Sequence, residues 1–432
     1  MEIFLYQVLP IICAVLMVLL AILWIPTMAW QVIHGIRGFL PLRKPKRKEG
    51  KQHAFAVLVC ARNESEVIGN LIDSIREQQY PQDKYKIFCL ADNCTDDTAA
   101  VARAKGCEVL ERFDPLRKGK GFALEALTAY INKAYADVFD AYLVIDADNL
   151  LPPDFMQKLS EGFNGGLDVV SGWRTAKNPF DSVVSGCYDI FWSLVMRMYN
   201  AVRCSNGMSC MVYGTGFAVR SEILKDGWQT STMTEDGEFS CMARMKGYKI
   251  GLLQDAKFYD EQPTKPRFFF SQFRRWEVGG VQCFTKLWKQ ALARMKTNFV
   301  DGFDIFCFLM LPISQTAMIL SFIPYAGMLI LSGVPDKLLW LLLAVPVLAV
   351  LAIAALAAFG LAADKKPVLR MWRSILAFPV FILPTAFIAM SAILRPKTEW
   401  TIIPHSSVKD MGNVEDVPPD PILEKVKQLK NK

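Results

Sequence analysis

Histidine is scarce in this chain, and its cysteines lack the close spacing that metal centres use. The 432 residues include three histidines and 11 cysteines, which are scattered from Cys13 to Cys307 without a CxxC pair. A zinc site needs clustered ligands, and a disulfide framework belongs to small secreted chains. The composition argues against both, and free thiols are typical of a reducing cytosol.

A strong excess of one charge is also missing. The chain has 49 Lys and Arg residues against 42 Asp and Glu residues, for a formal net charge of +7. The surplus basic residues lie close to apolar segments, which indicates contact with anionic lipid. We therefore expect the lipid bilayer as a partner and no nucleic acid.

Hydrophobic residues, by contrast, are abundant and unevenly distributed. They make up 52% of the chain, whose mean hydropathy is +0.23. A bilayer span needs about 20 apolar residues. Runs of sufficient length cover Val8–Trp30, Phe303–Ser332, Leu338–Ala363 and Val368–Leu394. Because these runs lie at the two ends, the sequence predicts one soluble domain held between membrane segments.

The apolar runs divide the chain into five predicted segments. These are an N-terminal transmembrane helix in 1–40, a cytosolic domain in 41–265, interfacial helices in 266–302, about three transmembrane helices in 303–395 and a polar tail in 396–432.

The basic residues next to the apolar runs bear on the orientation of the chain. A basic cluster, Arg43–Lys48, follows the first run, and the positive-inside rule keeps such clusters in the cytosol. We therefore expect a multi-pass protein of the plasma membrane with a cytosolic central domain. Three single crossings at the C-terminal end would place the tail outside, whereas Arg395 and Lys397 favour the cytosol, so the sequence leaves the side of the tail open.

The central domain alternates short apolar runs with segments of helical periodicity. Runs typical of buried strands are Ala54–Cys60, Lys86–Ala91, Cys107–Leu110 and Tyr142–Ile145. This alternation predicts an α/β fold with a mostly parallel sheet and helices on both faces. Ligands of such sheets bind beyond the carboxyl ends of the strands, where Glu64, Asp92 and the pair Asp146 and Asp148 are found.

Asp146-Ala147-Asp148 is a DxD motif at the end of an apolar strand. Two carboxylates one residue apart can face one divalent ion, and hard oxygen ligands suit magnesium or manganese. An ion held in this way can bridge a diphosphate and neutralise a leaving group. Two solvated aspartates in a loop would give the same pattern.

Two further motifs follow along the chain. Thr234-Glu235-Asp236 opens a helical stretch, and acidic residues in a first helical turn can simply cap the helix. Gln272-Phe273-Arg274-Arg275-Trp276 follows three phenylalanines, which is typical of an amphipathic helix at a membrane surface. Besides these structural roles, the glutamine, arginine and tryptophan can line an acceptor site.

The order DxD, TED, QxxRW and then membrane helices resembles the processive, inverting family-2 glycosyltransferases, the synthases of cellulose, chitin, hyaluronan and poly-N-acetylglucosamine. The resemblance covers residues 55–276. It implies a GT-A-type nucleotide-sugar-binding domain, a UDP-sugar donor, Mg²⁺ or Mn²⁺ as cofactor, and a growing polysaccharide as acceptor and product. Such synthases can also have an accessory membrane subunit.

The resemblance implies donor-binding and metal-binding residues. Glu64 is expected near the uridine, and Asp92 is expected to contact the base. Lys120 lies in a lysine and glycine segment that approaches the donor, and Asp146 is expected among the residues that bind the nucleotide sugar. Asp148, with help from Asp146, is expected to bind the metal.

The resemblance also implies the groups that act on the acceptor. Asp236 of the TED motif, next to Glu235, is expected to take the proton from the acceptor hydroxyl. Gly214 and Thr215 match a turn beside the terminal sugar of the acceptor.

The QxxRW motif supplies the remaining expected contacts. Gln272 and Trp276 are expected at the acceptor, and Arg275 is expected to face the diphosphate. Phe273 departs from the family pattern, because many members have a polar or basic residue there. Lys397-Thr398-Glu399-Trp400-Thr401 resembles a trailing tryptophan motif that some members return to the active site.

Several functions are compatible with these motifs. The main prediction is a processive β-glycosyltransferase that polymerises glucose or N-acetylglucosamine and translocates the product through its own membrane channel. One alternative is a non-processive transferase that adds one sugar to a lipid carrier. Another is a non-catalytic membrane subunit that inherited the domain, which the acidic set Asp92, Asp146, Asp148 and Asp236 argues against.

Overall fold

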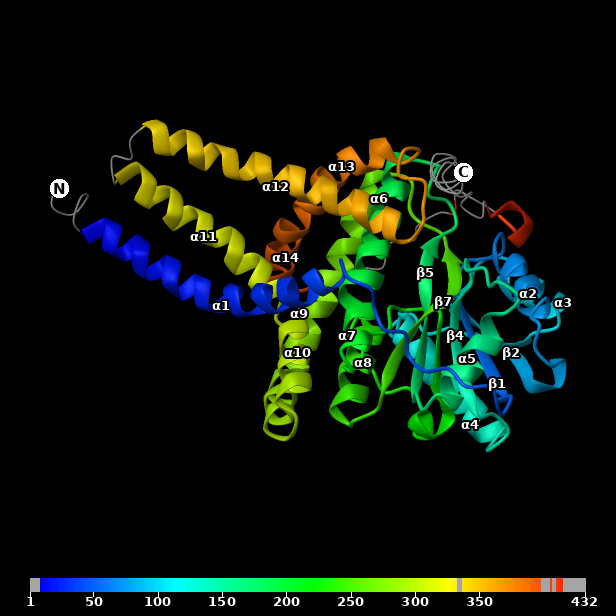
Figure 1. Ribbon diagram of the computed structural model, residues 1–432. Coiled ribbons are helices and arrows are strands. Elements are labelled where there is room, and N and C mark those ends of the chain that lie inside the picture. Colours follow the sequence, from blue (N-terminus) through cyan, green and yellow to red (C-terminus); the bar gives the residue numbers. More distant parts are fainter. Residues whose placement is uncertain (1–7, 332–335, 398–404, 406–408, 415–432) are drawn as a thin grey trace.

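The computed structural model describes residues 8–331, 336–397, 405 and 409–414. Figure 1 shows an α/β domain and a group of long helices that project away from it. Three of these helices, α1 (Leu9–Arg37), α11 (Leu311–Leu331) and α12 (Asp336–Ala363), extend in the same direction away from the sheet.

In the described part of the chain, the strands form a seven-stranded sheet in the order β3-β2-β1-β4-β6-β5-β7. Strand β6 is antiparallel to β4 and β5, and the other neighbouring pairs are parallel. The strands are β1 (Phe55–Ala61), β2 (Tyr85–Asp92), β3 (Glu108–Arg112), β4 (Ala141–Asp146), β5 (Val169–Ala176), β6 (Phe217–Arg220) and β7 (Ile250–Asp260). The predicted fold class, a mostly parallel α/β sheet between long apolar helices, is confirmed.

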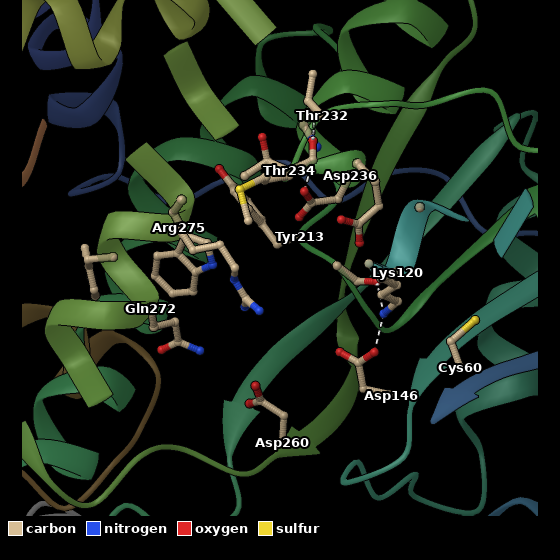
Figure 2. Close-up of a pocket in the computed structure, with 18 of the residues that line it drawn as sticks. Cys60, Lys120, Asp146, Tyr213, Thr232, Thr234, Asp236, Asp260, Gln272 and Arg275 are labelled. Carbon is tan, nitrogen blue, oxygen red and sulfur yellow. Dashed lines mark hydrogen bonds and ion pairs between the residues drawn. The ribbon is translucent and has the colours of Figure 1, made fainter. Parts of the chain in front are cut away.

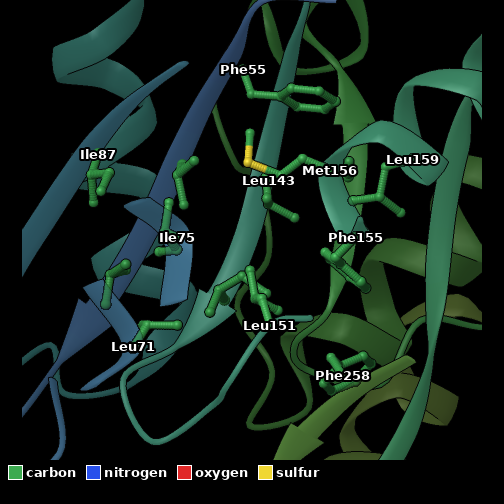
Figure 3. Packing of buried hydrophobic residues seen from close by; sticks show 14 of the residues in the cluster. Phe55, Leu71, Ile75, Ile87, Leu143, Leu151, Phe155, Met156, Leu159 and Phe258 are labelled. Carbon is green, nitrogen blue, oxygen red and sulfur yellow. The ribbon is translucent and has the colours of Figure 1, made fainter. Parts of the chain in front are cut away.

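Helices cover both faces of the sheet, which explains the near-continuous apolar sequence of the central strands. On one face, buried side chains of β1, β4 and the covering helices form the core that Figure 3 shows. The helices of this face are α2 (Ile68–Arg76), α3 (Thr98–Ala104) and α5 (Phe155–Asn164). Those of the other face are α4 (Lys120–Ala134), α6 (Val183–Leu194), the π-helical segment Val195–Ala201, α7 (Val202–Ser205) and α8 (Glu235–Met245).

After the sheet, the chain enters a second group of helices that adjoins the carboxyl edge of the sheet. They are α9 (Pro266–Thr297), α10 (Phe299–Leu309), then α11 and α12, and finally α13 (Trp372–Ile382) and α14 (Pro384–Leu394). Among the described residues, α1 and the α13–α14 stretch are long and apolar enough to cross a membrane. The pair α10–α11, bent by 61°, would be a third span. Two to three candidate spans support membrane association, against the roughly four that the sequence predicts.

The C-terminal tail returns to the α/β domain. His405 contacts the carboxylates of Glu64 and Glu261, and the side-chain amide of Asn70 donates to the Lys409 carbonyl over 3.2 Å. Residue 405 therefore lies on the same side of the membrane as the domain. These contacts favour the cytosolic side for the tail, as Arg395 and Lys397 do. Residues 398–401, most of the trailing tryptophan motif, lie outside the described residues.

A fully buried ionic cluster connects the two parts of the molecule. Asp304 of α10 accepts hydrogen bonds from Arg203 of α7 at 2.7 Å and from Arg244 of α8 at 2.9 Å. Trp30 of α1 donates its indole N–H to the same carboxylate over 2.7 Å. All three ionic side chains are essentially inaccessible to solvent, so the cluster fixes α1 and α10 against the domain.

We expect the Asp304→Ala substitution to destabilise the protein strongly. It leaves two buried arginines without their shared carboxylate, and loss of one partner from a buried ion pair costs about 3–5 kcal/mol. Denaturant unfolding of the purified protein in detergent measures the effect. The matched control is Glu111→Ala, which removes the exposed Arg103–Glu111 pair and should cost less than about 1 kcal/mol. Equal effects of the two substitutions would contradict this account.

Candidate active site

A large cavity opens at the carboxyl edge of the sheet. Its volume is about 1500 Å³, which exceeds the roughly 300–1000 Å³ of a typical small-molecule site. It is lined by the ends of β1 and β4, the first turns of α4 and α8, one side of α9, and the membrane-side helices α10, α11, α13 and α14. The cavity therefore has room for a donor and an acceptor together.

Sheet register brings the predicted donor-binding residues to this edge. Cys60 pairs with Asp146 between β1 and β4, and Ala61 pairs with Ala91 between β1 and β2. Glu64, Asp92 and Asp146 consequently follow neighbouring strand ends, and all three line the cavity. Asp92 is 5% exposed and forms an ion pair with Arg112 at 2.6 Å, so part of its role is structural.

Lys120 begins α4 and reaches across the cavity floor to Asp146, as Figure 2 shows. Its ammonium group contacts the Asp146 carboxylate and donates to the Gly214 carbonyl over 2.9 Å. Gly119, which precedes it, has a φ of +137°, a conformation that side chains disfavour. Glycine at this position lets the chain turn directly into the helix and aim Lys120 at the carboxylates.

Asp146 and Asp148 fit a divalent cation whose coordination is completed by a substrate. Both carboxylates line the cavity, and the ammonium of Lys120 on Asp146 marks a position that attracts a cation. Among the described residues, no group of three or more His, Cys, Asp or Glu side chains forms a complete metal site. Magnesium in nucleotide enzymes commonly uses one or two carboxylates plus substrate phosphates, which is the set available here.

The TED segment begins α8 and faces the cavity. Burial raises the pKa of both adjacent carboxyls, and repulsion from Asp236 helps to raise that of Glu235 to about 8. Asp236 also accepts a hydrogen bond from the Gly237 backbone N–H at 2.8 Å, which stabilises its anionic form. Glu235 therefore mostly holds a proton near neutral pH, whereas the Gly237 N–H, Lys120 and Arg174 oppose the rise in the pKa of Asp236.

Helix α9 holds the TED segment in place. Gln282 accepts a hydrogen bond from the Met233 backbone N–H at 2.9 Å, and the Cys283 thiol lies 3.4 Å from the Thr234 hydroxyl. A Cβ atom on Gly279 would lie 2.8 Å from the Thr234 backbone nitrogen. Glycine at this position allows the two segments to approach closely, which couples the QxxRW helix to the predicted base.

The QxxRW side chains occupy the cavity-facing side of α9. Figure 2 shows Gln272 and Arg275 pointing from α9 into the space opposite Lys120 and Asp146. Trp276 stacks on Phe191 with centroids 6.2 Å apart. These aromatic side chains form an apolar wall of the kind on which a sugar ring can lie.

The packing of Phe273 explains why this position departs from the family pattern. It is 4% exposed and belongs to a cluster with Tyr188, Phe269 and Ile388, so it joins α9 to α6 and α14. Among the predicted site residues, Thr215 alone does not line the cavity. Its hydroxyl accepts from the Asp146 backbone N–H at 2.8 Å, so it supports the DxD turn from behind.

Several lining residues were not predicted. Asp260 ends β7, where it pairs with Arg174 at the end of β5. Neither strand was predicted, so no sequence signal placed these two residues at the edge. Glu277 and Gln315 line the end of the cavity nearest the membrane helices, and His405 lines the donor end.

The model of the "Glycosyltransferase like family 2" matches residues 53–279, which include the sheet, the TED segment and the first part of α9. The chain belongs to this family. The family assignment and the fold together identify it as a glycosyltransferase with associated membrane helices.

Individual relatives are distant. A β-monoglucosyldiacylglycerol synthase of Synechocystis is 23% identical over 269 residues, which cover 59% of this chain and 53% of the relative. The probable glucomannan 4-β-mannosyltransferase 14 of Arabidopsis thaliana is 24% identical, with coverage of 52% and 44%. This chain thus spans about half the length of these relatives.

Among solved structures, the mannosyltransferase PcManGT of Pyrobaculum calidifontis, in complex with GDP-Man and Mn²⁺, is similar in fold. The TM-score is 0.56 and the sequence identity 19%, and the match covers 88% of this chain and all of that one. This match covers a larger share of the chain than residues 53–279 of the family model, so it includes helices outside the sheet domain.

We expect Mn²⁺ binding to tighten as the pH rises from 6 to 8. Burial, together with repulsion from Asp146, raises the pKa of Asp148 to about 7. A carboxylate must lose its proton before it can bind the ion, so affinity should fall roughly tenfold per pH unit below the pKa. Electron paramagnetic resonance of free Mn²⁺, with UDP present, measures the binding.

The control for this experiment is Asp148→Asn, which should weaken binding and flatten its pH dependence to that of UDP itself. An unchanged pH profile in the variant would show that Asp148 does not control the site.

Proposed function

We propose that this glycosyltransferase transfers a single hexose from a nucleotide-sugar donor to a hydroxyl group of a membrane lipid. The observation that carries the proposal is the composition of the cavity wall opposite the donor carboxylates. Candidate membrane-spanning helices supply this wall through Leu311, Pro312 and Gln315 of α11, Ile382 of α13 and Thr385 of α14. An acceptor that resides in the bilayer can therefore reach the site from the membrane.

The chemistry of the cavity supports an inverting transfer. Asp236 takes the proton of the acceptor hydroxyl, whose oxygen attacks the anomeric carbon from the face opposite the diphosphate. Arg275 stabilises the charge that develops on the departing nucleoside diphosphate. Asp146 and Asp148 would hold a Mg²⁺ or Mn²⁺ ion, which would further neutralise the diphosphate. An α-linked donor would give a β-linked product.

The comparisons support this acceptor class and leave the sugar open. The Synechocystis relative and a second, from Nostoc, are both called β-monoglucosyldiacylglycerol synthases, names that describe transfer of one glucose to a diglyceride. UDP-glucose is accordingly the first donor to test. We place the protein in the plasma membrane with its catalytic domain in the cytosol, because Arg43–Lys48 follow the first apolar helix.

A processive polysaccharide synthase is the second candidate. Gln272, Arg275 and Trp276 of the QxxRW motif all line the cavity, as the family resemblance predicts for a synthase. The aromatic wall around Trp276 would bind the terminal sugar of a polymer as readily as a glycolipid headgroup.

The product made by the purified full-length protein in nanodiscs tests the two candidates. UDP-glucose, UDP-N-acetylglucosamine and GDP-mannose are offered separately with Mn²⁺, in bilayers with and without diacylglycerol. We expect a lipid that carries one hexose, formed only when the lipid acceptor is present. A high-molecular-weight polysaccharide made without added lipid would replace our proposal with the second candidate.

We expect Asp236→Asn to abolish transfer and to retain donor binding. The variant keeps the shape of the side chain and loses the base, whose contribution is typically about 10²–10⁴-fold. Glu235→Gln is the matched control next to it. Because Glu235 holds a proton near neutral pH, its amide should cause a much smaller loss. Turnover measures the first effect and calorimetric titration with UDP the second. Full activity of Asp236→Asn, or equal losses in both variants, would remove Asp236 from this role.

A further inference from the structure

The membrane-side end of the cavity contains polar groups that the transfer chemistry does not use. Glu277 of α9 and Gln315 of α11 both line it, among Leu309, Leu311 and Ile382. The two helices meet closely here, because a Cβ atom on Gly280 would lie 2.9 Å from the Pro312 ring. Polar side chains within an apolar wall are costly unless they bind something.

Two amide oxygens in this cavity have no hydrogen-bond partner among the residues that the structure describes. They are Oε1 of Gln272 and Oε1 of Gln315, both buried from solvent. Buried polar atoms in proteins are nearly always paired, so these oxygens point to a ligand that fills the space beside them. An amide oxygen only accepts hydrogen bonds. The ligand must therefore present donors, which hydroxyl groups do and a fully ionised phosphate does not.

Charge at this end of the cavity disfavours an anion. Burial raises the pKa of Glu277 to about 8, so its carboxyl is mostly protonated at neutral pH and can both donate and accept. The lysines and arginines that line the cavity are Arg62, Lys118, Lys120, Arg174 and Arg275. The first three lie toward the donor, Arg174 is paired with Asp260, and Arg275 belongs to the QxxRW turn that we assign to the diphosphate.

We infer that Glu277 and Gln315, together with Gln272, form an acceptor subsite that selects an uncharged lipid with a hydroxyl-bearing headgroup over a lipid phosphate. This inference rests on the proposed function and specifies its substrate class. The hydroxyls of a glycerol or sugar headgroup donate to the two amide oxygens and exchange hydrogen bonds with Glu277, while the acyl chains lie along the apolar wall. Glu277 and Gln315 act as specificity residues and do not touch the anomeric carbon.

Competition between two acceptors tests the inference in the full-length protein. Nanodiscs contain either diacylglycerol or a polyprenyl phosphate at equal mole fraction, and glycolipid is quantified by mass spectrometry with the donor that the protein uses. We expect transfer to diacylglycerol to exceed transfer to the polyprenyl phosphate at least tenfold. A preference for the polyprenyl phosphate would contradict the inferred headgroup selectivity but not the proposed transfer to lipid. Polymer formation without added lipid would contradict the proposed function itself.

Variants of the two residues provide an independent readout. Glu277→Ala and Gln315→Leu should each raise the acceptor KM roughly tenfold, the effect of one lost buried hydrogen bond. The acceptor KM should rise far more than the donor KM, and Glu277→Gln should remain within about threefold of the native protein since it preserves hydrogen bonding. The matched controls are Glu77→Ala and Gln290→Leu, at exposed positions outside the cavity.

The two variants are judged separately because a cavity substitution can disturb folding. Acceptor-free UDP release reports an intact donor site in each preparation. If Glu277→Ala loses this release, Glu277→Gln and Gln315→Leu decide the outcome. An unchanged acceptor KM in a variant that retains donor turnover would contradict the subsite.

Discussion

The ion pairs of the Asp304 carboxylate determine how the membrane helices are positioned against the catalytic domain. One buried anion binds Arg203, Arg244 and Trp30, which come from α7, α8 and α1. Helix α8 carries the TED segment at its N-terminal end, so the same helix bears an anchor to the membrane part and the predicted base. Because a buried ion pair is stable only when all partners are in place, the position of the base is fixed relative to the bilayer.

A second constraint is the crowding of acidic side chains in a site with little access to water. Asp146, Asp148, Glu235, Asp236 and Asp260 all line one cavity. Burial raises the pKa of Asp148, Glu235, Asp236 and Asp260, and neighbouring anions add to the effect at Asp148, Glu235 and Asp260. Cations relieve this repulsion: Lys120 lies on Asp146 and Arg174 on Asp260. A donor that arrives with a divalent ion would complete the neutralisation, so donor and metal should bind cooperatively.

Much of this site could be predicted because its residues follow strands with strong apolar signals. The runs that became β1, β2 and β4 predicted Glu64, Asp92 and Asp146 at one sheet edge, and parallel register brought them together. Strand β7 was missed because polar Gln254, Asp255 and Lys257 interrupt its pattern, so Asp260 was missed as well. Composition also cannot show the 61° bend between α10 and α11, on which the number of candidate spans depends.

A sequence motif describes only the residues close to the reacting centre, so QxxRW does not by itself distinguish a polymer from a lipid acceptor. Its aromatic and polar groups recognise the sugar or hydroxyl next to the reacting centre, and that requirement is common to both. The difference must lie farther from the centre, where a polysaccharide needs polar contacts along its length and a lipid needs apolar surface. In the described residues, that distant wall is formed by Leu309, Leu311, Pro312 and Ile382 with only a few polar side chains between them. Such a wall can contact acyl chains behind a small headgroup, but it offers a hydrated sugar chain few hydrogen-bond partners. The lipid acceptor is therefore favoured by the contacts of α9 with α11 and α14, which build this wall, and not by the QxxRW motif.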